Sequence, residues 1–182
     1  MTLPLTRTLL LTAATLILPG TALAQANPEA VATGEYLVVT SGCHDCHTPF
    51  IMGPNGPEPD MTRGLSGHPQ DIVIEAPAKL AEPWVGAMNA TNTAWSGPWG
   101  VSFAANLTPD SETGIWREMS QEQFIQALRT GRHLGQGRQI LPPMPWSVYG
   151  KKTDEDLKAI YAYLQQIPPI KNKVPDPLPP AQ

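Results

Sequence analysis

The sequence predicts one mainly α-helical domain, with a helix near each end and a long loop-rich insertion between them. Three segments carry apolar residues at helical spacing behind good N-cap residues. The 21 prolines and 15 glycines fall almost entirely outside these segments, which indicates much loop. A length of 182 residues suits one domain with a full core.

The first predicted helix spans residues 27–40. Asn27 is a good N-cap residue, and Pro28 suits the first helical turn. Gly34 lacks a side chain, so a second helix could cross closely at this point. Gly42 then ends the element.

Two further helices are predicted toward the C-terminal end. The first covers Ser120–Thr130, where the initial serine forms a capping box with Gln123 and Gly131 provides the stop. The second covers about residues 154–166, behind the N-cap residue Thr153. Its apolar stripe consists of Leu157, Ile160, Tyr161 and Leu164.

The insertion, at about residues 48–105, is irregular in pattern. Short strands are expected at Asp71–Ile74 and Val101–Phe103, with an aromatic turn at Trp95–Gly100. A loop of this length without elements of its own would be unusual, so we expect it to pack as a subdomain.

The first residues have the pattern of an export signal. Arg7 provides a short positive region, and Leu9–Leu18 form an apolar run. Small-residue cleavage sites end at Ala24 and Ala26, and we expect the cut after Ala24. The alternative is an uncleaved N-terminal anchor, although the apolar run is short for a membrane span.

The predicted organisation is therefore a signal peptide at 1–24, a domain at 25–170 and an extended, proline-rich tail at 171–182. The periplasm is the expected location, with membrane contact only through partner proteins. The formal net charge of −4 argues against a nucleic-acid binder, which normally carries a basic patch.

The only two cysteines lie in the sequence Cys43-His44-Asp45-Cys46-His47. This C-x-x-C-H pattern is the attachment signature of c-type haem. The thiols of Cys43 and Cys46 can add to two vinyl groups on one edge of a porphyrin, and His47 then provides the proximal iron ligand. The sequence predicts one covalently bound haem c.

Three other interpretations of the cysteine pair stay open. A thioredoxin-like redox pair is disfavoured because no βαβ pattern surrounds the motif. Half of a zinc site is disfavoured because the chain has no second cysteine pair. A short structural disulfide is compatible with an exported protein.

Met144 is the best candidate for the second axial ligand of the iron. It lies in Leu141-Pro142-Pro143-Met144-Pro145, where prolines on both sides restrict the backbone and present the thioether on a stiff loop. The alternative is that Met144 fills the core. Met52 and Met61 are rival ligands, whereas Met119 is expected to pack.

The remaining histidines, His44, His68 and His133, are not expected to bind the iron. His68 could serve as a sixth ligand or contact a haem propionate, but packing is the favoured interpretation. His133 follows a helix end, where a cation suits the dipole.

These pieces together resemble the class I cytochrome c family: an N-terminal helix, C-x-x-C-H, a methionine loop and a C-terminal helix. Further segments look like the branch that includes cytochrome subunits of bacterial alcohol and aldehyde dehydrogenases. They are Gly34–Leu37, Asn106–Asp110, Leu157–Leu164 and Ile167–Ile170. The resemblance implies a class I fold with both terminal helices packed around the haem, and it carries the haem roles to Cys43, Cys46, His47 and Met144.

The resemblance also implies that the first and last helices cross, with Gly34 against Tyr161 or Leu164. Dehydrogenase subunits of this kind usually carry three haem motifs, whereas this chain carries one. We therefore expect a single-haem electron carrier rather than an enzyme. Its expected partners are a dehydrogenase, other cytochromes or a terminal oxidase.

Two alternative functions stay open. The chain could be the cytochrome subunit held in a periplasmic dehydrogenase complex. It could also be a haem enzyme or gas sensor, which would need an open iron position, and the stiff Met144 loop argues against that.

Overall fold

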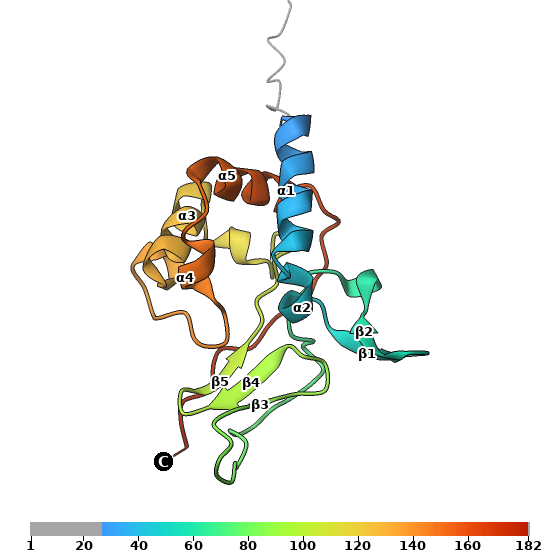
Figure 1. Ribbon diagram of the computed structural model, residues 1–182, viewed down its shortest axis with the longest axis vertical. Helices are drawn as coiled ribbons and strands as arrows, with labels where there is room; N and C mark the ends of the chain where they lie inside the picture. The colour runs from blue at the N-terminus through green and yellow to red at the C-terminus, as the bar shows by residue number, and fades with distance from the viewer. Residues whose placement is uncertain (1–26, 182) are drawn as a thin grey trace, which may run out of the picture.

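The computed structural model describes residues 27–181 (Figure 1). The predicted signal peptide at 1–24, and both cleavage positions, lie outside these residues. Figure 1 shows the helices α1, α3 and α5 toward one end of the molecule and the sheet β3–β5 toward the other.

Five α-helices form the helical part of the fold. Their bounds are α1 Pro28–Thr40, α2 Cys43–His47, α3 Gln121–Thr130, α4 Trp146–Tyr149 and α5 Asp154–Leu164. Short 3-10 turns are found at η1 Met61–Arg63, η2 Ile115–Arg117 and η3 His133–Gly135. The three predicted helices are confirmed as α1, α3 and α5, whereas the sequence analysis predicted neither α2 nor α4.

The predicted helix caps are present in the structure. The side chain of Asn27 accepts a hydrogen bond from the backbone N–H of Glu29 at 3.1 Å. Ser120 forms the capping box of α3 with Gln123, and Thr153 caps α5. These caps satisfy backbone donors that a helix N-terminus otherwise leaves unpaired.

The insertion contains two small antiparallel sheets. One is the hairpin β1 Phe50–Gly53 with β2 Gly56–Pro59. The other has the order β3–β4–β5, with β3 Ala87–Met88, β4 Ala94–Gly97 and β5 Gly100–Phe103. The expected strand at Val101–Phe103 is therefore confirmed within β5.

Two expectations for the insertion are wrong. Trp95–Gly100 is not only a turn, because its first residues belong to β4. Asp71–Ile74 is not a strand: Val73 is 75% exposed, and the carbonyl of Ile72 binds the ring of His68 at 2.9 Å instead of a neighbouring strand. A local apolar run forms a strand only where a partner strand lies beside it.

Helices α1 and α5 cross at Gly34, where a methyl group would lie 2.0 Å from the backbone oxygen of Ala159. The close crossing was expected, but Gly34 faces Ala159 and Tyr163 rather than Tyr161 or Leu164. Residues four apart share a helix face, so Ala159 and Tyr163 line the crossing together. Leu164 points into the core, where it is 2% exposed.

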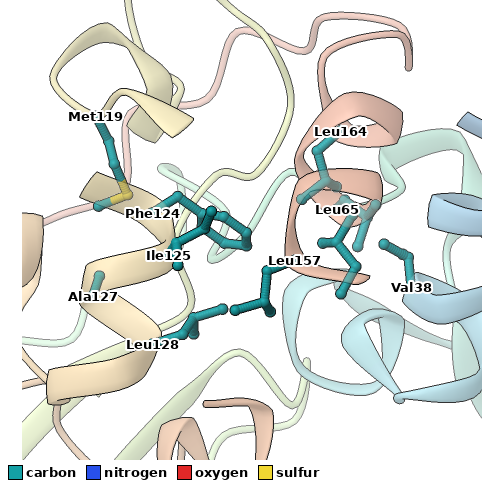
Figure 2. Packing of buried hydrophobic residues seen from close by; sticks show 10 residues of the cluster. Val38, Leu65, Met119, Phe124, Ile125, Ala127, Leu128, Leu157 and Leu164 are labelled. Atoms are coloured by element: carbon teal, nitrogen blue, oxygen red, sulfur yellow. The ribbon is translucent and has the colours of Figure 1, made fainter. Parts of the chain in front are cut away.

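The hydrophobic core lies between α1, α3 and α5 (Figure 2). Val38 from α1, Leu65, and Leu157 and Leu164 from α5 lie on one side of this cluster, and α3 contributes Phe124 and Leu128 from the other side. Burying these side chains is the main favourable term in the stability of such a domain.

The C-terminal segment is extended and packs against the insertion. The Asn172 side chain is buried and donates to the carbonyls of Ser66 and His68 at 2.7 and 2.8 Å. Further on, Leu178 and Val101 exchange backbone hydrogen bonds, each at 3.0 Å. The tail therefore contributes to the tertiary structure of the middle region.

Candidate functional site

The short helix α2 presents the C-x-x-C-H motif. Gly42 precedes it with φ 70°, a left-handed conformation that lets the chain leave α1 and start α2 at once. Within α2, Cys43 and Cys46 are three residues apart and therefore lie on one side, and His47 follows directly.

Both cysteines are free and half-buried. Burial raises the pKa of the Cys43 thiol to about 11 and also raises the pKa of Cys46. Both thiols are therefore protonated at neutral pH, and neither is taken up by a disulfide bond. The structure has no disulfide bond between Cys43 and Cys46, so it does not support the interpretation as a structural disulfide.

The orientation of His47 is set by a distant backbone carbonyl. Its Nδ1 donates to the carbonyl oxygen of Ala105 at 2.8 Å, which places the proton on Nδ1 and leaves the lone pair of Nε2 free. Burial lowers the pKa of His47, so the ring is neutral at physiological pH. A neutral imidazole held in this way has the form of a histidine metal ligand.

The loop that carries Met144 is tied to the same strand that precedes Ala105. Ser102 in β5 donates through Oγ to the carbonyl of Pro142 at 2.5 Å. Met144 is half-buried and packs against the same hydrophobic cluster as Cys43. The β5 region thus anchors both the histidine and the methionine loop.

The other methionines have different surroundings. Met52 is 77% exposed and Met61 is 63% exposed, so neither lies beside the core. Met119 is 6% exposed and belongs to the core, as expected. Of the candidate ligands named from the sequence, Met144 is therefore the one with an apolar, half-covered environment.

His68 is a buried residue whose two ring nitrogens are both occupied. Its Nε2 donates to the carbonyl of Ile72 at 2.9 Å, and its Nδ1 accepts from the hydroxyl of Thr93 at 2.9 Å. The ring packs on Phe103 with 4.8 Å between the centroids. These contacts support the packing interpretation of His68.

The other two histidines also have ordinary surroundings. Nδ1 of His44 lies 2.8 Å from the hydroxyl of Thr48. His133 begins the turn η3, two residues after the left-handed C-cap Gly131 of α3.

Tyr149 connects the methionine loop to the C-x-x-C-H motif, and nothing in the sequence pattern indicated it. Its hydroxyl donates to the backbone carbonyl of Ser41 at 2.7 Å. Burial, with smaller contributions from the nearby thiols of Cys43 and Cys46, raises the pKa of Tyr149 to about 12. The hydroxyl therefore keeps its proton and links α4 to the chain just before α2.

Within residues 27–181, no three side chains of the His, Cys, Asp and Glu types gather as a metal site. The zinc interpretation therefore finds no third ligand in this part of the chain. No helix of the same residues is long and apolar enough to cross a membrane.

Comparison with known proteins relates the chain to dehydrogenase subunits. The fructose dehydrogenase cytochrome subunit of Gluconobacter japonicus is 30% identical over 148 residues, which is 81% of this chain and 23% of that protein. The gluconate 2-dehydrogenase cytochrome c subunit of Pantoea cypripedii is 30% identical over 76% of this chain and 23% of its own length. The chain is homologous to part of these cytochrome c subunits.

A third relative is the cytochrome c subunit of the quinone alcohol dehydrogenase of Gluconobacter oxydans, 29% identical over 86% of this chain and 26% of its own. The chain thus spans about a quarter of the length of these relatives. No protein family model matches it.

The homology to cytochrome c subunits raises the question of whether this site fits a haem c. The donor set does: two free thiols on one side of α2 precede a neutral imidazole with a free Nε2. A flat apolar group such as a haem also needs apolar side chains that the protein covers only in part, so that they can contact the group. Six large apolar side chains beside the core are partly buried in this way: Leu107, Leu134, Ile140, Met144, Trp146 and Tyr149.

Proposed function

We propose that this protein is a periplasmic, single-haem c-type cytochrome that transfers electrons between redox partners. Cys43 and Cys46 would hold the haem through thioether bonds, and His47 and Met144 would be the two axial ligands. A class I cytochrome c arrangement of the helices belongs to the same proposal. The observation that carries it is the hydrogen bond from His47 Nδ1 to the carbonyl of Ala105, which leaves Nε2 free in a short helix that also carries two free thiols.

The haem, when bound, would supply one-electron chemistry through the ferric and ferrous states of its iron. The residues of the chain would position the group and limit its rearrangement. The carbonyl of Ala105 keeps the imidazole in one tautomer and one orientation. The loop that carries the Met144 thioether is restrained by the hydrogen bond from Ser102 to Pro142 and by the flanking prolines.

Visible spectra of the protein made in a host that attaches c-type haem would test this proposal. We expect a low-spin spectrum in the oxidised and reduced states that does not respond to carbon monoxide. Met144→Ala should open the sixth position, so the reduced variant should bind carbon monoxide. Met52→Ala is the matched control, because that side chain is 77% exposed and should leave the spectrum unchanged.

Two results would contradict the proposal. A wild-type protein that binds carbon monoxide readily would have a vacant or labile site, which favours a haem enzyme or gas sensor. A wild type without covalent haem, beside a control cytochrome that is loaded normally, would remove the cytochrome interpretation entirely.

A second candidate function is that of a cytochrome subunit held in a dehydrogenase complex. The observation that favours it is the homology to proteins named as subunits of fructose, gluconate and alcohol dehydrogenases. Purification of the tagged protein from its native host distinguishes the two. A stoichiometric dehydrogenase that stays bound at high salt supports a subunit, whereas a monomer supports a diffusing carrier.

A further inference from the structure

The proposed iron ligand His47 is held by two segments that come from elsewhere in the chain. Its Nδ1 donates to the carbonyl of Ala105 at 2.8 Å, across 58 residues of sequence. Its own backbone carbonyl accepts a hydrogen bond from the N–H of Gly67 at 2.8 Å. Both partners belong to the loop-rich insertion, so this insertion leaves the chain directly after His47 and returns to the same residue.

The segment 65–68 lies between the C-x-x-C-H motif and the residues that follow β5. On the motif side, the N–H of Gly67 binds the carbonyl of His47. On the opposite side, the N–H of His68 donates to the carbonyl of Ala104 at 2.9 Å. All four residues of the segment are buried. Hydrogen bonds on both sides therefore fix the separation of the motif from the end of the insertion.

Gly67 packs directly on the carbonyl group that binds His47. Its φ is 79°, a left-handed conformation that side chains with a Cβ rarely adopt. A Cβ at this position would lie 2.5 Å from the carbonyl oxygen of Ala104 and 2.6 Å from both the carbonyl carbon and the carbonyl oxygen of Ala105. These are backbone atoms, so no side-chain rotation would relieve the contact.

We propose that Gly67 is a positioning residue for the imidazole of His47. The missing side chain lets the carbonyl of Ala105 approach Nδ1 of His47, and the hydrogen bond that results lowers the reduction potential of the haem iron. The proposal rests on the proposed function, because it concerns a ligand of that iron.

The direction of the effect on the potential follows from the basicity of the ligand. A hydrogen bond donated by Nδ1 makes the imidazole a more basic ligand at Nε2. A more basic ligand stabilises the ferric state more than the ferrous state, because the ferric ion carries the higher charge. Hydrogen bonding behind a haem ligand is therefore one of the means by which a protein sets the potential.

In Gly67→Ala, the carbonyl of Ala105 must move. Ordinary contact with a Cβ begins at 3.4 Å, about 0.8 Å more than the 2.6 Å available here. Gly67 is bonded to the backbone of His47, so a retreat of Ala105 from Gly67 should also take it away from His47. Their bond of 2.8 Å would then approach about 3.6 Å, which is no longer a hydrogen bond.

The reduction potential of the holoprotein and the exchange of the His47 Nδ1 proton test this role. Loss of the partner of a ligating histidine has effects of about tenfold or more, so Gly67→Ala should shift the ferric–ferrous equilibrium about tenfold toward the ferrous form. For a one-electron couple, this is a rise of about 59 mV. The Nδ1 proton, followed by NMR, should exchange with solvent about tenfold faster. A potential and an exchange rate equal to those of the wild type overturn the proposal.

Gly64→Ala is the matched control, directly before the segment 65–68. Gly64 has φ −51°, which any residue adopts. Its new Cβ would lie 3.4 Å from the nearest atom, the carbonyl oxygen of Met61, which is an ordinary contact. The potential and the proton exchange should therefore stay at their wild-type values. Equal shifts in both glycine variants would mean that general loosening of the loop is responsible, and would refute the assignment to Gly67.

Ala105→Gly tests the same hydrogen bond from the accepting residue. A glycine gives the backbone at this position more freedom, so the carbonyl should be held less firmly and the potential should rise. This variant adds no atoms and creates no clash, so it keeps the proposal testable if Gly67→Ala takes up no haem. An unchanged potential in Ala105→Gly overturns the proposal.

The double variant separates positioning from a general structural role. If Gly67 acts through the carbonyl of Ala105, then Gly67→Ala should shift the potential much less when Ala105→Gly is already present. Additive shifts would mean that Gly67 acts by another route, and would overturn the proposal. A low-spin spectrum indifferent to carbon monoxide in every variant means that the proposed ligation is intact, so failure of this inference is distinguishable from failure of the proposed function.

Discussion

Gly34 provides a sharp test of how the two terminal helices are held together. In Gly34→Ala, the new methyl group would lie 2.0 Å from the backbone oxygen of Ala159 and 2.8 Å from Cβ of Tyr163. Neither atom is the end of a flexible side chain, so α1 and α5 must move apart. The movement would loosen the contact of Val38 with α5, in a region where Val38 is fully buried.

The expected change in stability is the difference between two effects. Overpacking of a well-packed contact costs about 1–3 kcal/mol. Alanine is favoured over glycine within a helix by about 1 kcal/mol, which offsets part of that cost. Because the new methyl group would meet backbone atoms and a Cβ, the cost should lie in the upper part of its range, at about 2–3 kcal/mol. We therefore expect a net loss of about 1–2 kcal/mol, which corresponds to about 2–8 °C in Tm for a domain of this size.

Chemical and thermal unfolding of the holoprotein, followed by circular dichroism and haem absorbance, would measure this loss. Ala32→Gly is the control, because Ala32 is exposed on the same helix and its replacement reports the propensity effect alone. If Gly34→Ala were as stable as the wild type or more stable, the helices would not cross as closely as described, and the reasoning would be refuted.

Three further predictions concern other parts of the chain. Tyr149→Phe removes the hydrogen bond to Ser41, so we expect a loss of about 1 kcal/mol in urea unfolding. The loosened methionine loop should also let the reduced variant bind carbon monoxide, to which the wild type should not respond. Burial lowers the pKa of His68, so the unfolded chain binds a proton at this ring more tightly than the folded chain does, and the free energy of unfolding should fall as the pH drops below about 6.5. His68→Gln should reduce this dependence of stability on pH. An unchanged dependence would contradict the assignment of this effect to His68. Ser120→Ala removes the capping box with Gln123 and should cost about 1 kcal/mol by the same unfolding assay, whereas no change would mean that the cap is dispensable.

The helix termini were predictable because their signals are local. Ser120 caps the backbone of Gln123, and Thr153 caps that of Asp156, so donor and acceptor are three residues apart. Gly131 ends α3 in the left-handed conformation for the same kind of local reason. Such contacts form whatever the rest of the chain does, so residue type alone indicates them.

The insertion was less predictable because its contacts are distant in sequence. The residues Asp71–Ile74 have the sequence pattern of a strand, but in the structure the carbonyl of Ile72 accepts a hydrogen bond from the ring of His68. The edge of the β3–β5 sheet pairs with Leu178 in the tail, which no pattern near Val101 indicates. Pairing partners of a strand are chosen by the whole fold, so propensity is a weak guide there.

The candidate site divides in the same way. The sequence by itself determined which groups are available: two thiols and an imidazole within five residues, and one methionine between prolines. Only the tertiary structure decided how these groups are held. His47 donates to the carbonyl of Ala105, Ser102 donates to the carbonyl of Pro142 in the methionine loop, and Tyr149 donates to the carbonyl of Ser41. Each of these contacts uses a backbone carbonyl, which every residue type carries, so no sequence pattern can mark it before the chain is folded.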